Sequence, residues 1–319
     1  MNDFIRALVI VGVAGGAATA DVSIFDGFGD GDRDNNGVTD GGGVDDASDV
    51  GINWYGIGGF TSGGDPKPEL TVGTDAGLGS GNALFGQSRG GGSELAGFFG
   101  QSVALGQTVG DRMILNFDVR LDTTREPLSE LTSSAELRFG LYTDNDNEIG
   151  TGGWGTSDGD FDSNTPGIRG DSGFLFRLGI GETRPVNPQG RIVYEREGGT
   201  QILGGSGDET IQIADDFSGI YDDLAHSIEV VFERIDAAPG EDLLITVTLD
   251  GVSFSDTTAG ENLPALTDLA TFDYFAFNPN QDQDWVLDNF SLRTVAIPAP
   301  GMAGVVGVSG LMLAGRRRR

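Results

Sequence analysis

Residues 112–121 read Arg-Met-Ile-Leu-Asn-Phe-Asp-Val-Arg-Leu, and this stretch decides the fold. Every odd-numbered residue from Met113 to Leu121 is apolar, whereas Asn116, Asp118 and Arg120 stand between them. Successive side chains of a β-strand point to opposite faces of a sheet. The period of two therefore predicts a strand with one buried face and one polar face.

The same alternation recurs along the rest of the chain. It is found in residues 135–143, 172–180, 228–233, 243–249, 272–277 and 285–292. Asp250-Gly251 lies between two such runs and predicts a tight hairpin, because both central residues of that turn favour positive φ. Only residues 215–224 and 262–269 suggest a turn or two of helix. Many short strands separated by turns predict an all-β, antiparallel two-sheet sandwich, with short apolar helices at the two termini.

Composition limits the partners and the chemistry. The chain has 49 acidic and 19 basic residues and a formal net charge of −30, which excludes nucleic acid and anionic membranes as electrostatic partners. It contains no cysteine, so disulfides, cysteine nucleophiles and thiolate metal sites are all excluded. Its single histidine, His226, excludes a His-rich metal centre and is interpreted as a polar residue at the edge of a strand.

Residues 1–20 have the order of parts found in a secretory signal peptide. Arg6 precedes a short apolar core over residues 7–14, and Ala18-Thr19-Ala20 forms a small-x-small exit before Asp21. We therefore expect export, with a sandwich domain spanning residues 21–295. An acidic, glycine-rich loop over residues 26–50 belongs to that domain.

The C-terminal residues 296–319 combine three features in a fixed order. A proline-bracketed box comes first, then an apolar run over residues 302–315, then a basic end. The box is Pro298, Ala299, Pro300 and Gly301, and the basic end is Arg316, Arg317, Arg318 and Arg319. The apolar run is shorter than the roughly 20 residues of a comfortable bilayer span. By the positive-inside rule the arginines would stay on the cytoplasmic side.

This tail resembles the PEP-CTERM sorting signals of Gram-negative-type bacteria, with Ala299 in place of the usual glutamate. The resemblance implies processing by an exosortase-like membrane protease and transient membrane insertion through residues 302–315. It also implies delivery to the cell surface or extracellular matrix, often alongside exopolysaccharide. No particular activity follows from it.

Residues 284–293 carry a second resemblance. The apolar-Asp-Asn-apolar-Ser-Leu ending is similar to the last strand of jelly-roll carbohydrate-binding modules and concanavalin-like sandwiches. That resemblance implies pairing of the N-terminal and C-terminal strands, and it makes Asp288 a candidate ligand of a structural calcium ion. An ordinary Asp-Asn in an edge strand is the alternative.

The acidic loop contains the best candidate for a metal site. Its oxygen-bearing residues stand at alternate positions before and after Gly37, and they are Asp32, Asp34, Asn36 and Asp40. Calcium loops use this spacing, because alternate side chains converge on one ion while glycine permits the sharp turn. Gly43 stands where a full EF-hand has its bidentate glutamate. The alternative is a solvated acidic loop.

Paired carboxylates would indicate a glycosidase. Glu195 and Glu197 share one face of a strand, although an isolated pair of this kind is more often a charged strand edge. Trp154, flanked by glycines in a loop, is the preferred sugar-stacking residue, whereas Trp54 and Trp285 lie within strands and are expected in the core.

The sequence thus favours an exported, non-catalytic surface or matrix protein that associates with exopolysaccharide or other glycans and contains structural calcium. Two alternatives remain open. One is a glycan-cleaving hydrolase or lyase on the same fold, and the other is a purely structural matrix component bridged by calcium.

Overall fold

The computed structural model of the 319-residue chain describes residues 23–28, 51–57, 69–74, 77–78, 81–87, 94–122, 127–131, 135–144, 171–181, 190–195, 203, 210–215, 219–236, 242–261, 263, 271–279 and 283–297. All of them belong to one unit, Asp21–Ile297. The predicted signal peptide, the predicted terminal helices and the sorting tail from Pro298 onward lie outside the described residues.

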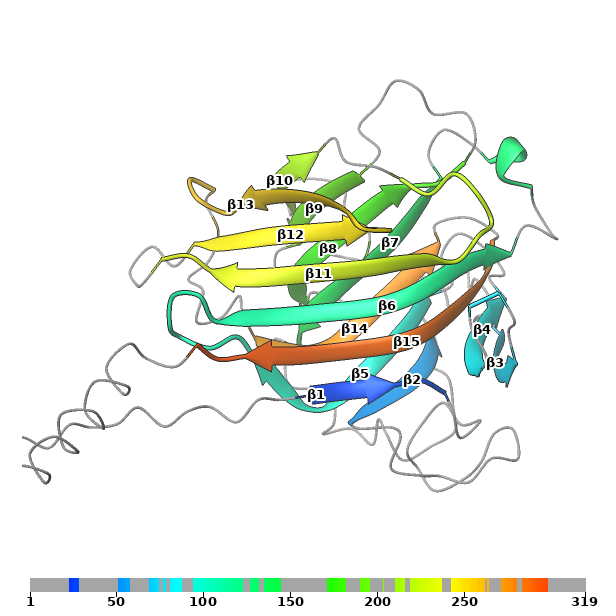
Figure 1. Ribbon diagram of the computed structural model, residues 1–319, viewed down its shortest axis with the longest axis horizontal. Helices are drawn as coiled ribbons and strands as arrows, with labels where there is room; N and C mark the ends of the chain where they lie inside the picture. The colour runs from blue at the N-terminus through cyan, green and yellow to red at the C-terminus, as the bar shows by residue number, and fades with distance from the viewer. Residues whose placement is uncertain are drawn as a thin grey trace, which may run out of the picture. The chain divides into compact units, whose positions relative to one another are not determined.

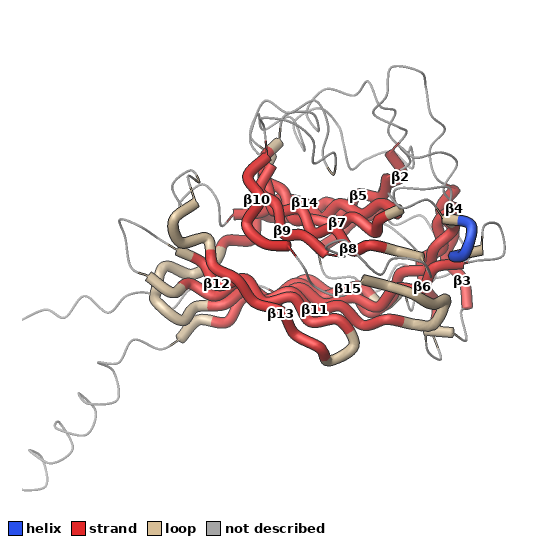
Figure 2. The backbone as a smooth tube through the Cα atoms, turned by 90° about the horizontal axis from the view of Figure 1, so that it is seen from above, coloured by secondary structure: helices blue, strands red, loops and turns tan. Residues whose placement is uncertain are grey.

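The described residues form two antiparallel sheets that face each other, as Figures 1 and 2 show. The eight-stranded sheet has the order β13 (Val252–Thr257), β12 (Leu243–Leu249), β11 (His226–Arg234), β6 (Arg112–Asp122), β15 (Asp284–Val295), β4 (Asn82–Gln87) and β3 (Glu69–Thr74), with β1 (Ser23–Asp26) also paired to β15. The seven-stranded sheet has the order β10 (Thr210–Asp215), β9 (Gly190–Glu195), β8 (Ser172–Gly179), β7 (Glu136–Thr143), β14 (Thr271–Pro279), β5 (Glu94–Ala104) and β2 (Ile52–Ile57). The predicted all-β sandwich is confirmed.

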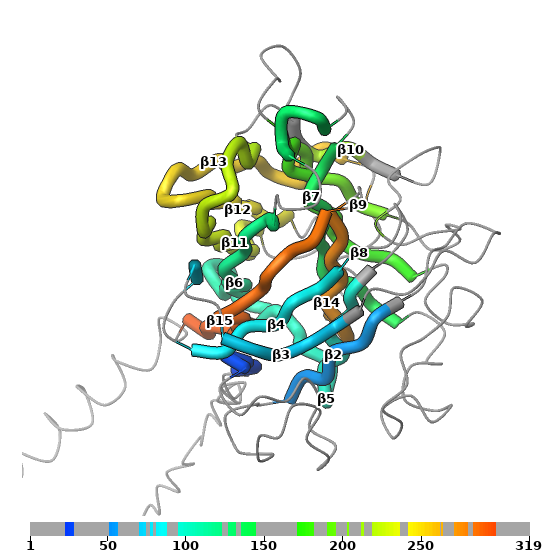
Figure 3. Tube along the Cα trace, turned by 90° about the vertical axis from the view of Figure 1, so that its right-hand side faces the viewer, coloured from blue at the N-terminus to red at the C-terminus, as the bar shows by residue number. Residues whose placement is uncertain are grey.

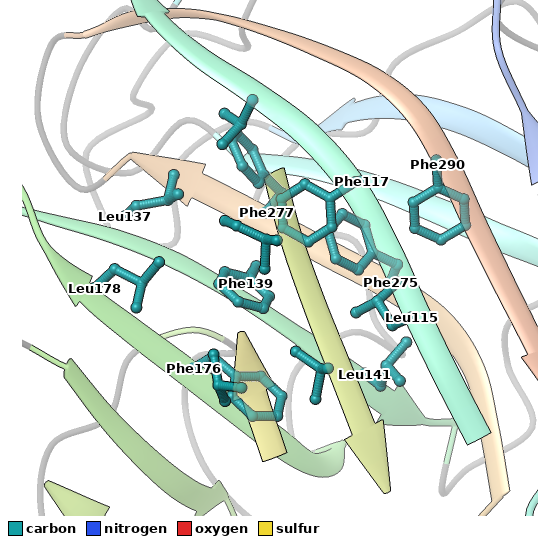
Figure 4. Close-up of a cluster of buried hydrophobic side chains, with 14 of the residues drawn as sticks. Leu115, Phe117, Leu137, Phe139, Leu141, Phe176, Leu178, Phe275, Phe277 and Phe290 are labelled. Carbon is teal, nitrogen blue, oxygen red and sulfur yellow. The ribbon is translucent and has the colours of Figure 1, made fainter. Parts of the chain in front are cut away.

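The core fills the space between the sheets. In β6 the five apolar residues at odd positions, Met113, Leu115, Phe117, Val119 and Leu121, are all buried, as their alternation predicts. The ring of Phe117 lies 5.0 Å from that of Phe139 and 5.4 Å from that of Phe275, both on the facing sheet (Figure 4). These contacts between rings at steep angles are typical of well-packed aromatic cores.

Both strand tryptophans are buried, which confirms their predicted place in the core. Trp54 lies directly across the β2–β5 ladder from Gly97, and Trp285 lies across the β15–β4 ladder from Gly86. A methyl group on Gly86 would lie 2.0 Å from the indole of Trp285. Each glycine therefore provides the room that the indole on the neighbouring strand occupies.

The first and last strands of the sandwich pair, as the resemblance of residues 284–293 implied. Ser23 lies opposite Arg293 and Asp26 lies opposite Phe290. The fully buried carboxylate of Asp26 accepts the indole N–H of Trp54 at 2.6 Å and the backbone N–H of Phe28 at 2.7 Å. Figure 3 shows β15 running between β6 and β4, so the last strand lies inside its sheet rather than at an edge.

The Asp250-Gly251 hairpin forms as predicted between β12 and β13, with φ angles of 51° and 81°. His226 begins β11 and is buried. Its Nδ1 lies 2.7 Å from Asp250 Oδ2, and its Nε2 lies 3.0 Å from Asp222 Oδ1.

Helices are nearly absent from this part of the chain. The turn of helix suggested for residues 215–224 is wrong where the structure describes them, because residues 210–215 form β10 and residues 221–225 are bends or irregular. The described residues contain one short 3-10 turn, η1 (Leu128–Glu130), and no helix among them is long and apolar enough to cross a membrane.

Candidate functional site

The outer face of the seven-stranded sheet, turned away from the eight-stranded sheet, carries an unusual set of side chains. Strand pairing arranges them in three rows, each running across neighbouring strands. The aromatic row is Glu195, Gly173, Tyr142, Tyr274, Phe98 and Asn53. The small row is Val193, Leu175, Gly140, Ala276, Ala96 and Tyr55. The arginine row is Arg191, Arg177, Arg138 and Asn278.

Aromatic rings contact one another along the aromatic row. Tyr142 and Tyr274 stack with centroids 5.5 Å apart, and Phe98 lies 5.4 Å from Tyr274. Glycines make this possible, since a methyl group on Gly140 or Gly173 would lie 2.6 or 2.7 Å from the Tyr142 ring. Together with neighbours in the small row and Leu203, these residues form a second buried apolar cluster, separate from the core between the sheets.

The two tyrosine hydroxyls of the aromatic row each donate a hydrogen bond to a carboxylate. Tyr142 donates to Glu195 Oε2 at 2.5 Å, and Tyr274 donates to Asp171 Oδ2 at 2.8 Å. The backbone N–H of Leu203 also donates to Glu195 Oε2, at 3.0 Å. Burial raises the pKa of the Tyr274 hydroxyl well above its ordinary value, and the negative charge of Asp171 raises that pKa further. Tyr274 is therefore a neutral hydrogen-bond donor at physiological pH.

Two arginines of the arginine row share one carboxylate. Glu136 Oε2 accepts from Nε and Nη2 of Arg138 at 3.1 and 3.0 Å, and from Nε and Nη2 of Arg177 at 2.8 and 2.6 Å. Arg138 Nη1 also donates to the carbonyl of Leu203 at 2.9 Å. The two guanidinium groups are thus fixed side by side, and their side chains are each 14% exposed.

Glu195 lies on the outer face of the seven-stranded sheet, but it is only 5% exposed and accepts hydrogen bonds from Tyr142 and Leu203. Its carboxylate therefore holds the fold together at this place. Glu197, the other member of the predicted pair, lies outside the described residues, as does Trp154.

The predicted calcium ligands Asp32, Asp34, Asn36 and Asp40 also lie outside the described residues. Asp288 is described and is 6% exposed, at a register shift of β15, where its Oδ1 accepts the backbone N–H of Asn289 at 2.7 Å. Within the described ranges, no group of three or more His, Cys, Asp or Glu side chains is arranged to hold a metal ion. Calcium binding by the loop or by Asp288 stays a prediction.

Sequence reasoning missed the arginine row. Arg138 and Arg177 occupy polar positions of alternating strands, so their exposure on one face was predictable strand by strand. Their alignment with Arg191 depends on the register between strands that are far apart in sequence. No single strand contains that information.

Solved structures of other proteins show a low similarity to this chain. The sequence matches no protein-family model and no curated protein. Similar solved structures include the potassium-bound carbohydrate recognition domain of Emp46p, with 12% identity, 70% of this chain and 86% of that chain covered, and a TM-score of 0.41.

Two further structures are similar at the same level. Arcelin-5, a lectin-like defence protein from Phaseolus vulgaris, has 10% identity, 88% and 100% coverage, and a TM-score of 0.42. A protein with a galectin-like fold from Bacillus subtilis has 9% identity, 76% and 90% coverage, and a TM-score of 0.41. Sequence identities and TM-scores this low do not by themselves identify a fold. The sandwich is therefore established by the strands and pairings described above.

Proposed function

We propose that this chain is an exported, non-catalytic protein of the cell surface or extracellular matrix that associates with glycans. The outer face of the seven-stranded sheet supports the proposal most directly. It places the partly exposed side chains of Asn53, Arg138 and Arg177 on one sheet face, and amide and guanidinium groups form hydrogen bonds with sugar hydroxyls. The PEP-CTERM-like tail and the signal-peptide-like start support export and delivery by an exosortase-like protease.

The carboxylate geometry favours binding over catalysis. A glycosidase needs two carboxyl groups that flank the bond to be cleaved and can reach it. Glu195, the described member of the predicted pair, is buried and accepts two hydrogen bonds from the protein itself. A carboxylate engaged in this way stabilises the sheet and is not free to protonate a leaving group.

The test is a binding assay of the full chain against a panel of neutral and acidic polysaccharides, with calcium and again with a chelator, followed by measurement of released reducing ends. We expect binding without release of reducing ends. A loss of binding in the chelator would support structural calcium in the loop of Asp32 to Asp40. Steady release of reducing ends would contradict the proposal and favour the hydrolase or lyase alternative.

A further inference from the structure

The edge of the eight-stranded sheet at β13 lacks the usual protection of a sheet edge. β13 pairs with β12 on one side, and no described strand pairs with its other side (Figure 1). An open edge presents backbone N–H and C=O groups to other chains, and proteins commonly block it with lysine, proline or a bulge. Residues 252–257 contain neither lysine nor proline, and their register with β12 runs without a shift.

The register of the hairpin identifies which backbone groups face outward. Leu249 and Val252 flank the two-residue turn and lie opposite each other, so they form a hydrogen-bonded pair. Hydrogen-bonded and non-hydrogen-bonded pairs alternate along an antiparallel ladder. Every second residue from Ser253 to Thr257 therefore directs its backbone N–H and C=O away from β12.

Two of these outward-facing residues are open to a partner. The N–H of Thr257 donates to Oδ1 of the neighbouring Asp256 at 2.7 Å, which covers one end of the edge. For the outward N–H and C=O of Ser253 and Ser255, no partner is found among the residues that the structure describes. β10 of the facing sheet comes close to β13 but forms no ladder with it.

The β13 edge also carries little charge, although the chain has a formal net charge of −30. Asp256 is the only charged residue of residues 252–257. The neighbouring side chains of Thr246 and Thr248 are uncharged, and their hydroxyls bond to those of Ser255 and Ser253. Two copies of so acidic a chain repel each other, and the repulsion is smallest where the contacting segments carry little charge.

We propose that β13 pairs with β13 of a second copy of this chain, in antiparallel direction about a two-fold axis at Phe254. In this register Ser253 of each copy lies opposite Ser255 of the other, and each such pair exchanges hydrogen bonds in both directions. The open backbone groups of the edge are thereby satisfied. The inference concerns assembly, and it stands apart from the glycan association proposed above.

The side chains of β13 fit this register. Phe254 lies opposite the Phe254 of the other copy, and aromatic pairs across neighbouring strands are favourable. Asp256 lies opposite Val252 and not opposite another Asp256, so the pairing places no two like charges directly opposite each other. An interface between two identical patches closes after two copies, so dimers form instead of fibres.

Sedimentation of the full chain over a range of concentrations tests the assembly. We expect the mean mass to rise from 33.3 kDa toward that of two copies. Ser255→Pro removes an outward N–H that the ladder with β12 does not use, so the hairpin should persist. Each copy then loses one hydrogen bond to the other, and the dimer dissociation constant should rise about tenfold or more.

Ser255→Ala is the matched control, because it keeps the backbone N–H and should leave the dissociation constant unchanged. Thermal melting of both variants checks that they remain folded. A mass that stays at one copy over the whole range, or a Ser255→Pro variant that dimerises as well as Ser255→Ala, would overturn the proposal.

The register has a test of its own, because the chain contains no cysteine and introduced thiols are the only ones present. Residues opposite each other in a hydrogen-bonded pair have Cα atoms about 5.5 Å apart, which a disulfide can span. Ser253→Cys and Ser255→Cys should therefore crosslink when the two variants are mixed and oxidised. Either variant alone places its thiols diagonally, about 7–8 Å apart, and should crosslink poorly.

A crosslink confined to the mixture supports both the edge and the register. Absence of a crosslink in the mixture would overturn the pairing. Crosslinking of a single variant to the same extent as the mixture would overturn the register and indicate another contact between copies. None of these outcomes bears on glycan binding, which the polysaccharide panel measures separately.

Discussion

The rings of Tyr142 and Tyr274 stack on the outer face of the seven-stranded sheet, with planes 16° apart, and their hydroxyls bond to two different carboxylates. Tyr142 is bonded to Glu195 and Tyr274 to Asp171. Both rings are fully buried, and ionisation of Tyr274 would place a charge in an apolar cluster beside Asp171.

Alkaline pH is expected to destabilise the protein through Tyr274. Its pKa is raised in the folded state, first by burial and then by Asp171, whereas an unfolded tyrosine ionises near pH 10. Stability is therefore fully present below about pH 10 and falls as the pH rises toward the folded pKa. Denaturant unfolding between pH 7 and pH 11 should show this loss, and Tyr274→Phe should flatten it.

At neutral pH, Tyr274→Phe is expected to cost about 1–3 kcal/mol, because Asp171 loses a buried donor. Tyr221→Phe is the control, since Tyr221 is 37% exposed and its substitution should keep the full alkaline dependence. A Tyr274→Phe variant with an unchanged pH profile would show that another group causes the loss.

Substitution of Glu195 is expected to destabilise the folded protein. Glu195→Ala removes the carboxylate that accepts from the buried Tyr142 hydroxyl and from the Leu203 N–H, and should lower the free energy of unfolding by about 2–4 kcal/mol. Glu195→Gln retains an acceptor oxygen and should cost less. Urea unfolding of the two variants checks the order. An unchanged stability in Glu195→Ala, together with loss of a glycan-cleaving activity, would instead support the enzyme alternative.

The packing of the first strand, β1, is expected to depend on the buried carboxylate of Asp26. Asp26→Ala removes the acceptor of both the Trp54 indole and the Phe28 N–H from a fully buried position, at a cost of about 2–5 kcal/mol. Asp26→Asn keeps one acceptor oxygen and should cost less. Thermal unfolding followed by tryptophan fluorescence measures both. If both variants were as stable as the unsubstituted protein, neither hydrogen bond would contribute to the pairing of β1.

Substitution of Gly173 is expected to disturb the stack. A methyl group there would lie 2.2 Å from the backbone oxygen of Leu141 and 2.7 Å from the Tyr142 ring, and the backbone cannot move aside cheaply. Gly173→Ala should therefore cost about 1–3 kcal/mol. Gly81→Ala is the control, because nothing lies within 4 Å of the added methyl group. Equal melting temperatures of the two variants would contradict this account.

Much of the fold was predictable from local pattern. The alternation in residues 112–121 became β6 with the predicted residues inside, and Asp250-Gly251 formed the predicted hairpin, because both signals depend only on neighbours in sequence. Trp54 and Trp285 were placed in the core correctly for the same reason.

The candidate site was not predictable in the same way. The alignment of Arg138, Arg177 and Arg191 depends on the register of three strands, and the burial of Glu195 depends on Tyr142 and Leu203. A single strand shows which residues share a face. It does not show which residues of other strands lie beside them.

The position of β15 has a consequence for the timing of folding. This strand lies between β6 and β4 and also pairs with β1, although it is made of residues 284–295. Until those residues leave the ribosome, β6 and β4 lack their common neighbour, and β1 lacks the strand with which it pairs in the described part of the chain. The eight-stranded sheet can therefore close only after residues 284–295 have been made, through contacts between distant parts of the chain that form slowly. For the exported protein proposed above, late closure of this sheet delays formation of the complete sandwich, which favours passage of the open chain through a narrow translocation channel.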